Sequence, residues 1–311
     1  MSAERATSAF HPRNWGQNIA IATLFLIARL PWRWAIAMGA GFGALAYALL
    51  RQRRAIVRTN LELCFPELAP GTREDWVREN FRYTGRGVAE LALAWFGGTH
   101  VDEIPCHIRG MEHLHSAVAS QRPVLLFSAH FTCIELAGRM LGRDLNLGGI
   151  YKPVAKRPIF DRIMRHSRAR NLGTVVARDD IKGILRLLKK KTILWYAGDQ
   201  HVRATEKVFA PFFGVPAATT TGLARLARIS GALVLPVFYN VVDGGLSYEI
   251  RIGPCLEGFP SDDKLHDMTR MNAAIEEAVR KHPTQYFWVH RRFRKRPNKG
   301  PSPYERLRDK L

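Results

Sequence analysis

The sequence predicts an α/β fold with a mostly parallel sheet flanked by helices, preceded by a hydrophobic helical segment that anchors the chain to a membrane. From residue 51 onward, short runs rich in β-branched and aromatic residues alternate with helical patterns, as is typical of parallel sheets covered on both faces. The first fifty residues differ, because they hold two long stretches without charge. We therefore expect a membrane-associated helical segment over residues 1–50 and one catalytic domain over residues 51–311.

The first fifty residues are expected to lie in or on a membrane. Two stretches without a formal charge, residues 15–28 and 34–50, are flanked by arginines and tryptophans, a pattern found at membrane–water interfaces. Each is shorter than the roughly 20 residues that a spanning helix needs, so one tilted span or a re-entrant pair is expected. The alternative is a pair of helices buried in a soluble core. The loose dinucleotide-binding pattern at residues 39–44 lacks a flanking strand and indicates close helix packing instead.

Beyond residue 50, strands and helices are predicted in alternation. Short apolar runs predict the strands, and segments of helical period lie between them. The predicted strands are residues 124–128, 174–177, 192–197, 233–239 and 248–252. The predicted helices are residues 134–141, 160–170, 181–190, 221–229 and 267–280. No internal repeat or second shift in composition interrupts this region, so it is expected to form one domain.

The chain is strongly basic. Its 47 lysines and arginines against 27 aspartates and glutamates give a formal net charge of +20. Such a surplus predicts anionic partners, which include nucleic acid, anionic lipid and an acidic or phosphorylated substrate. The sequence carries no helix-turn-helix, zinc-finger, RRM or KH signature, so no nucleic acid is expected as a partner. A basic nucleic-acid-binding protein is the alternative that the charge alone would support.

Neither a disulfide framework nor a metal site is predicted. The four cysteines are widely spaced without a Cys-x-x-Cys pair, and they are expected to be reduced and mostly buried thiols. One close pair of histidines, His113 and His115, has no third ligand nearby, so no metal is expected.

The segment from Pro123 to Gly138 carries the candidate chemistry. A predicted buried strand ends in a small-residue turn at His130, and Glu135 follows at the start of the next helix. A carboxylate there can accept the imidazole N–H, fix its tautomer and stabilise the imidazolium, which makes the histidine a general base. The carboxyl end of a strand is where open α/β sheets bind ligands. No G-x-S-x-G motif supplies a serine, and Cys133 is expected to be a buried thiol, so the base would act on a substrate hydroxyl.

Further motifs lie before and after this segment along the chain. They are Asn60–Glu67, His130–Glu135, Tyr151–Pro153, Ser167–Arg170, Trp195–Gln200, Val208–Gly214, Ala217–Thr220 and Gln285–Phe293. With its His-x4-Glu signature, the chain resembles the lysophospholipid-type acyltransferase superfamily. More narrowly, it resembles the late acyltransferases of lipid A synthesis, the lauroyl and myristoyl transferases of Gram-negative inner membranes, from near residue 10 to near residue 300. The resemblance implies a glycerolipid-acyltransferase-like fold.

The resemblance also implies a reaction. A fatty acyl chain, of lauroyl or myristoyl type, would pass from acyl carrier protein to the hydroxyl of a hydroxyacyl chain on a Kdo-lipid A precursor. His130 would be the base and Glu135 would orient and charge it, with neither a cofactor nor a covalent acyl-enzyme. Arg168 and backbone N–H groups at the start of the following helix are candidates to stabilise the oxyanion. Asp199 is expected to position Arg168, an acceptor-binding residue or the wall of the site, or else to cap a helix or turn.

Other basic residues are expected to bind substrates or partners. Lys152, where the family more often has arginine, and Arg170 are expected to support substrate binding. The cluster formed by His290, Arg291 and Arg292 is expected to dock anionic partners. The implied partners are acyl carrier protein, the lipid A precursor and anionic lipids of the inner membrane at its cytoplasmic face. A glycerolipid or another glycolipid is the alternative acceptor.

Overall fold

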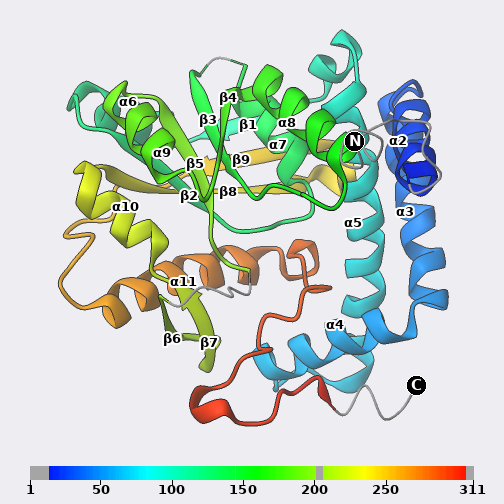
Figure 1. Ribbon diagram of the computed structural model, residues 1–311. Coiled ribbons are helices and arrows are strands. Elements are labelled where there is room, and N and C mark those ends of the chain that lie inside the picture. Colours follow the sequence, from blue (N-terminus) through cyan, green and yellow to red (C-terminus); the bar gives the residue numbers. More distant parts are fainter. Residues whose placement is uncertain (1–13, 144, 201–205, 306–311) are drawn as a thin grey trace, which may run out of the picture.

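A seven-stranded sheet forms the centre of the computed structural model, which describes residues 14–143, 145–200 and 206–305 (Figure 1). The strand order is β1-β9-β8-β2-β5-β3-β4, and every neighbouring pair is parallel except β8 with β9. Its strands are β1 (Cys106–Arg109), β2 (Val124–Ser128), β3 (Leu147–Tyr151), β4 (Gly173–Ala177), β5 (Ile193–Ala197), β8 (Leu233–Val242) and β9 (Ser247–Ile252). A separate antiparallel hairpin consists of β6 (Lys207–Phe212) and β7 (Val215–Thr220).

Helices surround this sheet. The α-helices of the described residues are α2 (Trp15–Ile27), α3 (Trp32–Leu49), α4 (Arg51–Cys64), α5 (Pro70–Phe96), α6 (Met111–Ala119), α7 (Ile134–Leu141), α8 (Pro158–Leu172), α9 (Ile181–Lys189), α10 (Gly222–Ser230) and α11 (Lys264–Lys281). The short 3-10 helices are η2 (Thr99–Glu103), η3 (Asp243–Gly245), η4 (Pro283–Gln285) and η5 (Pro297–Lys299).

The helices cover both faces of the sheet. Side chains alternate along a strand, so the successive residues Trp195 and Tyr196 of β5 point to opposite faces. A Cβ at Gly138 of α7 would contact the Trp195 ring, whereas one at Gly222 of α10 would meet the Tyr196 hydroxyl. Helices α7 and α8 pack on each other and on α5, and α9 packs on α10. The predicted α/β class with a mostly parallel, helix-flanked sheet is confirmed.

The predicted elements agree with the observed ones in type and order. Each predicted strand overlaps an observed strand, and α7 has the predicted bounds. Sequence patterns missed β1, β3, β6 and β7. Strand β3 contains two adjacent glycines, and β6 and β7 each contain a proline. Glycine and proline weaken the strand signal, because glycine has no side chain to pack and proline cannot donate to the ladder.

Helices α2 and α3 pack on α5 (Figure 1). Both helices leave large apolar side chains exposed. In α3, Ala35 and Ile36 are buried in the core, whereas Trp34, Phe42 and Leu45 are exposed. Of the described helices, none has by itself the length and apolar composition of a membrane span. Helices α3 and α4 reach them only as a pair, and that pair is bent by 94°.

Glycines allow α3 and α5 to approach closely. A Cβ at Gly43 would lie 2.1 Å from the carbonyl oxygen of Phe81, and one at Gly85 would lie 2.3 Å from the carbonyl oxygen of Gly39. Real Cβ atoms do not approach backbone oxygens so closely, so side chains at these positions would force the helices apart. The helix-packing interpretation of the glycine pattern at residues 39–44 is therefore confirmed.

Two buried asparagines hold the segment after α11 against the sheet. The side-chain amide of Asn80 in α5 donates to the carbonyls of Thr284 and Tyr286, over 2.7 Å each. The amide of Asn60 in α4 donates to the carbonyls of Trp288 and His290, over 2.7 and 2.9 Å. The N-terminal helices thus determine where residues 284–290 run, next to the carboxyl end of β2.

We expect Gly43→Ala to destabilise the protein by about 1–3 kcal/mol, because the new methyl group has no space between α3 and α5. Gly41→Ala in the same helix is the matched control, because nothing lies within 4 Å of a Cβ at Gly41. Alanine there should leave stability unchanged or raise it by up to about 1 kcal/mol. Chemical denaturation in detergent measures both variants, and equal unfolding midpoints would contradict the packing argument.

Candidate active site

His130 and Asp199 meet at the carboxyl edge of the sheet. Strands β2 and β5 are parallel neighbours in which Ser128 pairs with Ala197. Each strand is followed by a short loop, so His130 and Asp199 each come two residues after the end of their strand. Parallel strands in register end at the same edge, and the two side chains therefore face each other.

The Asp199 carboxylate holds His130 at two points. Its Oδ1 lies 2.5 Å from the imidazole Nδ1, and its Oδ2 accepts the backbone N–H of His130 over 3.0 Å. An ionised carboxylate can only accept, so Nδ1 carries the proton and Nε2 is left to act as a base. The side chain of Asp199 is 2% exposed, whereas that of His130 is 28% exposed. The pair is therefore anchored on its buried side and accessible on its other side.

The charge on Asp199 is stabilised in spite of its burial. Burial by itself raises the pKa of Asp199, but the charge of His130 and three hydrogen bonds outweigh it and hold that pKa well below its usual value. A carboxylate that stays ionised beside an imidazole stabilises the imidazolium that forms when the ring takes a proton.

The structure assigns Glu135 a different partner from the expected one. The predicted hydrogen bond from the His130 ring to Glu135 is wrong, because Asp199 occupies Nδ1. Glu135 instead pairs with Arg168 of α8, whose Nε donates to both carboxylate oxygens over 3.1 and 3.2 Å and whose Nη2 donates as well. The indole N–H of Trp95 in α5 adds a bond of 2.9 Å. Glu135 leaves α7 on the side that packs against α8 and α5, which is why it reaches these residues.

Glu135 and Arg168 form a largely buried ion pair in the wall of the site. Burial raises the pKa of Glu135, but the charge and hydrogen bonds of Arg168 outweigh it, with smaller effects from Trp95 and His130, and the net pKa is lowered. Of the alternatives expected for Asp199, positioning of Arg168 is wrong, since Asp199 contacts His130 and Tyr286. Positioning of the backbone of the site wall agrees with the structure, because Asp199 accepts the backbone N–H of His130. The residue that positions Arg168 is Glu135.

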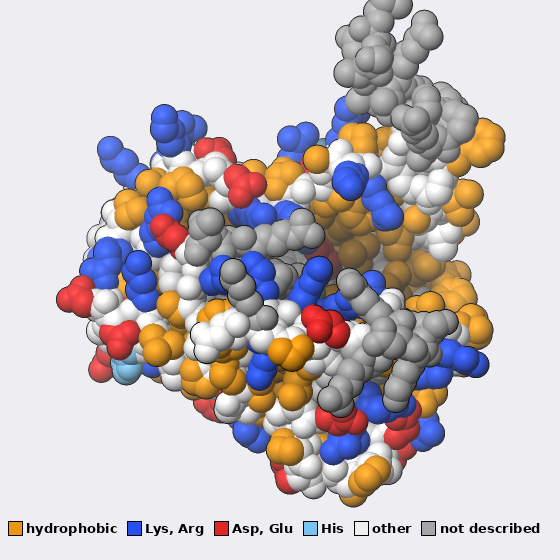
Figure 2. All heavy atoms as spheres, turned by 60° about the horizontal axis from the view of Figure 1, so that its bottom comes forward, with side chains coloured by type: hydrophobic (Ala, Val, Ile, Leu, Met, Phe, Trp, Pro, Cys, Tyr) orange, Lys and Arg blue, Asp and Glu red, His pale blue; other side chains and the backbone are white. Residues whose placement is uncertain are grey.

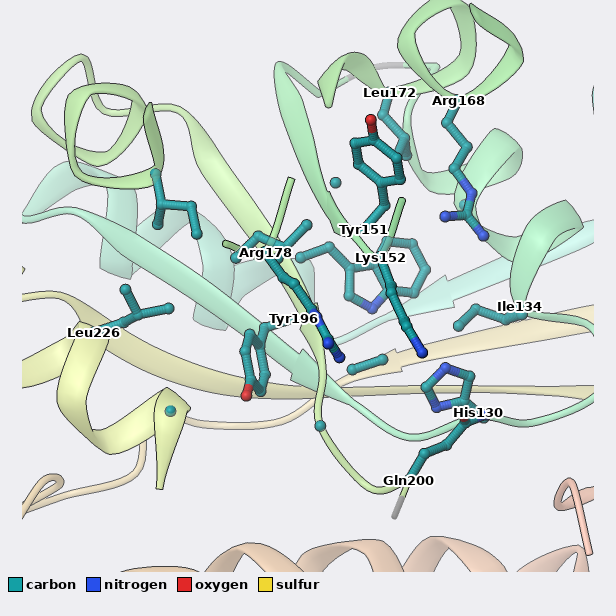
Figure 3. A pocket seen from close by; sticks show the side chains of 18 of the residues that line it. His130, Ile134, Tyr151, Lys152, Arg168, Leu172, Arg178, Tyr196, Gln200 and Leu226 are labelled. Atoms are coloured by element: carbon teal, nitrogen blue, oxygen red, sulfur yellow. The ribbon is translucent and has the colours of Figure 1, made fainter. Parts of the chain in front are cut away.

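A cleft of about 840 Å³ opens beside His130 at this edge of the sheet (Figure 3). Its walls come from α7, α8, β3, β5, α9 and α10, and much of the lining is apolar. The apolar side chains that line it are Ile134, Ile150, Met164, Leu172, Ile181, Ile184, Trp195, Leu226 and Ile229. Among the described lining residues there is no serine or cysteine.

Lys152 and Arg178 bring positive charge into the cleft. They follow β3 and β4, and Figure 3 shows the ends of both side chains directed toward the space above His130. Lys152 thus lies where substrate binding was expected of it. Arg170, the other expected binding residue, is not among the described lining residues, and its guanidinium donates to the carbonyl of Trp95 over 2.8 Å.

The cluster expected to dock partners is partly internal. Arg292 is 2% exposed, and its guanidinium donates to the carbonyl of Ala218 and to Thr219 Oγ1, over 2.7 and 3.1 Å. The prediction that Arg292 docks partners is therefore wrong, because its guanidinium is buried and binds β7 inside the protein. His290 and Arg291 are half-buried and are not among the described residues of the cleft.

Cys133 is an inert thiol, as the sequence predicted. It is fully buried, and burial raises its pKa well above the usual value. Its Sγ lies 3.8 Å from the carbonyl of Tyr239, in the core. A buried thiol in such surroundings cannot act as a covalent nucleophile on a substrate in the cleft.

Sequence reasoning missed three residues of the site: Trp95, Arg178 and Tyr286. Tyr286 donates its hydroxyl to Asp199 Oδ2 over 2.8 Å. One signal could have paired His130 with Asp199, because each follows a short apolar strand of a sheet expected to be parallel. Tyr286 lies within the motif Gln285–Phe293, but nothing in that motif indicated that its hydroxyl would reach Asp199. No signal existed for Trp95, which comes from a long helix.

This site places an imidazole that can move a proton beside a cleft that can hold an apolar chain, with fixed positive charge nearby. That combination fits an enzyme that transfers an acyl group between amphiphilic molecules.

The chain belongs to the bacterial lipid A biosynthesis acyltransferase family, whose model matches residues 2–295. It is 36% identical to the lipid A biosynthesis lauroyltransferase of Escherichia coli (strain K12) over 300 residues, which are 96% of this chain and 98% of that relative. It is 34% identical to the palmitoleoyltransferase of the same organism, with coverage of 92% and 94%. The myristoyltransferase of that organism is 26% identical, with coverage of 95% and 92%. The protein is thus an acyltransferase of lipid A biosynthesis.

We expect Asp199→Asn to lower kcat by about 10²- to 10⁴-fold, because an amide cannot stabilise the imidazolium and favours the wrong tautomer. Asp267→Asn is the matched control: Asp267 is equally buried and accepts the backbone N–H of Ser261, outside the cleft. Acyl transfer by the two purified variants is compared. Near-normal turnover of folded Asp199→Asn would contradict the assigned pair.

We expect Glu135→Gln to be less stable than the wild type at pH 7 and to approach it as the pH falls. The lowered pKa of Glu135 means that its carboxylate stabilises the fold above the unfolded-state pKa of about 4.3. This stability is lost as pH falls through the folded-state pKa, so the difference should shrink from about pH 5 toward pH 3. Urea unfolding at several pH values measures this difference in stability, with Glu79→Gln, whose side chain is half-exposed, as control. A difference that is constant with pH would rule out this linkage.

Proposed function

We propose that the protein transfers a fatty acyl chain from the thioester of acyl carrier protein to the hydroxyl of a hydroxyacyl chain on a Kdo-lipid A precursor. The observation that carries the proposal is the His130–Asp199 pair at the end of a cleft with apolar walls. The family and the printed activities of its members, which are lauroyl, palmitoleoyl and myristoyl transfer in lipid A biosynthesis, supply the substrate class.

In the proposed mechanism His130 is the general base. Its Nε2 takes the proton of the acceptor hydroxyl while the oxygen attacks the thioester carbonyl. The tetrahedral intermediate then collapses, the C–S bond breaks, and the leaving thiolate takes the proton back from the imidazolium. The ester and the free thiol of the carrier are the products. No covalent acyl-enzyme is needed, and the described lining residues include neither serine nor cysteine to form one.

Glu135 and Arg168 support this reaction from the cleft wall. Glu135 fixes the Arg168 guanidinium, and both residues line the cleft that holds His130. A fixed positive charge and the backbone N–H groups at the start of α7 can stabilise the negative charge that develops on the thioester oxygen. Glu135 therefore acts on the reaction by orienting Arg168, and its charge adds to that of Asp199 near His130.

The apolar lining selects the acyl chain. Each CH₂ group buried there contributes roughly 0.8 kcal/mol of binding free energy, so the depth of the cleft sets the preferred length. Relatives of similar identity to this chain transfer different acyl groups, lauroyl at 36% and palmitoleoyl at 34% identity. The side chains of the cleft therefore decide which acyl group is transferred, and family membership does not specify it.

Positive charge suits the anionic groups of both substrates. Lipid A precursors carry phosphates and acidic sugars, and acyl carrier protein is acidic. Lys152 and Arg178 lie within the cleft. On the face shown in Figure 2, Lys and Arg side chains gather around a hollow with hydrophobic walls. Such a rim attracts anionic substrates and orients their head groups while their chains enter the apolar space.

The N-terminal helices are proposed to hold the enzyme at the inner membrane, on its cytoplasmic face. Helices α2 and α3 expose a row of large apolar side chains next to basic residues of α4. The exposed apolar residues are Trp15, Ile19, Phe25, Leu26, Leu30, Trp34, Phe42, Leu45, Leu49 and Leu50. Tryptophans and arginines at the ends of such a surface fit the head-group region, and an anionic leaflet would attract the arginines.

The test supplies the purified enzyme with lauroyl, myristoyl and palmitoleoyl thioesters of acyl carrier protein and with two acceptors, Kdo-lipid A precursor and lysophosphatidic acid. We expect acylation of the first acceptor only. We expect His130→Ala to lower turnover by about 10²- to 10⁴-fold, with His113→Ala, on the surface of α6, as matched control. Acyl chains appearing on lysophosphatidic acid alone would reject the proposed acceptor, and full activity of folded His130→Ala would reject the base.

A further inference from the structure

Tyr286 lies behind the His130–Asp199 pair, on the side away from solvent. Its hydroxyl donates to Asp199 Oδ2 over 2.8 Å, and the whole residue is 4% exposed. Oδ2 also accepts the backbone N–H of His130. Among the described residues the carboxylate therefore has three donors, two from His130 and one from Tyr286, and the aromatic hydroxyl is the one that does not come from His130 itself.

We propose that Tyr286 is a positioning residue that tunes the His130–Asp199 pair. Its hydroxyl fixes the orientation of the carboxylate and neutralises part of the charge with which Asp199 holds the imidazole. This inference rests on the proposed function, in which His130 is the general base, and goes beyond it by assigning a residue that does not touch the substrate.

The backbone around Tyr286 is built to hold it in place. Residues Phe131 and Tyr286 form an antiparallel bridge, in which Phe287 N donates to the carbonyl of His130 over 3.0 Å. On the other side of the bridge, Thr132 N donates to the carbonyl of Gln285 over 2.9 Å. The loop that carries His130 and the segment that carries Tyr286 are therefore one rigid unit.

Side chains fix the same unit to the rest of the fold. The amide of Gln285 makes two bonds of 2.8 Å with the backbone of Val241 in β8. Asn80 of α5 donates to the carbonyl of Tyr286. The ring of Tyr286 packs edge-on against Phe131 and Trp288, with centroid distances of 5.7 and 4.7 Å. These contacts hold the ring in the orientation that directs its hydroxyl at Asp199.

The electrostatics of the pair agree with a donor role for Tyr286. Burial raises the pKa of Tyr286, and the charge of Asp199 raises it further, so the hydroxyl keeps its proton at any working pH. Burial also raises the pKa of Asp199, but the charge and hydrogen bonds of His130, together with the bond from Tyr286, lower it overall. Other charged groups near His130 are Lys152 after β3 and Arg178 after β4, whose ends point toward the space above the ring (Figure 3). Glu135 on α7 also interacts electrostatically with His130. None of the three is altered by a change at Tyr286.

A purely structural role for Tyr286 predicts a different result from a tuning role. Removing the hydroxyl leaves Asp199 with more uncompensated charge, so it attracts a proton on the imidazole more strongly. We expect Tyr286→Phe to move the acid limb of the kcat/KM pH profile upward by about half a pH unit to one unit. We expect kcat at the plateau to fall about tenfold with KM within about twofold of the wild type.

Tyr304→Phe is the matched control. Tyr304 is also buried, and its hydroxyl bonds with Asn60 and with the backbone N–H of Phe293, away from Asp199. It should lose stability without moving the acid limb. An unmoved acid limb in folded Tyr286→Phe, or an equal shift in Tyr304→Phe, would overturn the proposal.

A double-mutant cycle tests whether Tyr286 acts through Asp199. In the Asp199→Asn background, Tyr286→Phe should cause no further loss of kcat, because the charge that it tunes is gone. Additive losses would overturn the proposal. Replacing Tyr286 by 3-fluorotyrosine keeps the fold and makes the hydroxyl a stronger donor, so the acid limb should move to lower pH. A shift in the other direction would contradict tuning by the hydrogen bond.

The proposal can fail independently of the proposed function. Titration of the His130 imidazole, followed by NMR with labelled histidine, reports on the pair without any substrate. An upward shift of this titration in Tyr286→Phe supports tuning even if the assay substrates are not the right ones. An active wild type with identical imidazole titrations in both proteins would leave the acyltransferase mechanism intact and reject the role of Tyr286.

Discussion

The structure depends on the adjacent carboxyl ends of two parallel strands, β2 and β5. Because Ser128 of β2 pairs with Ala197 of β5, the residues that follow these strands emerge side by side. His130 and Asp199 meet there, and the ionised carboxylate both orients the ring and holds the loop backbone. A shift of one residue in this register would move the end of one strand relative to the other and separate the pair. The remaining elements of the site are arranged around this contact.

A second buried pair, Glu135 with Arg168, stands in the same cleft but on different elements. It joins α7 to α8 and, through Trp95, to α5. Two carboxylates near one histidine thus have separate partners and separate roles. Asp199 holds the imidazole and Glu135 holds a guanidinium, so the cleft presents the proposed base and a fixed positive charge together. The carboxylates of Asp199 and Glu135 are both largely buried, and each accepts hydrogen bonds from several donors, as burial of a charge requires.

The surface of the molecule suits substrates with apolar chains and anionic heads. Helices α2 and α3 leave a row of apolar side chains exposed, and the glycines of α3 allow that helix to pack closely on α5. The same α5, through Asn80, holds the segment that carries Tyr286 against the base. The helices that we propose to contact the membrane are therefore linked by a short chain of contacts to the His130–Asp199 pair. In the proposed mechanism this arrangement keeps the base close to the bilayer.

Local pattern was sufficient to predict the fold class, the main strands and helices, and His130. Alternating apolar runs and helical periods are local properties, and a histidine at the end of a buried strand can be seen in a short window. The partner of His130 could not be predicted in this way. Glu135 is near in sequence, but its helix directs it toward Arg168, whereas Asp199 is distant in sequence and adjacent in the sheet. Arg292 was misjudged for the same reason: a run of basic residues is visible in the sequence, but whether a side chain lies inside or outside depends on what packs over it. The sequence by itself therefore determined the elements and the position of the histidine that we propose as base, and only the tertiary structure decided the carboxylate, the ion pair and the tyrosine around it, because strand order and helix packing bring distant residues together.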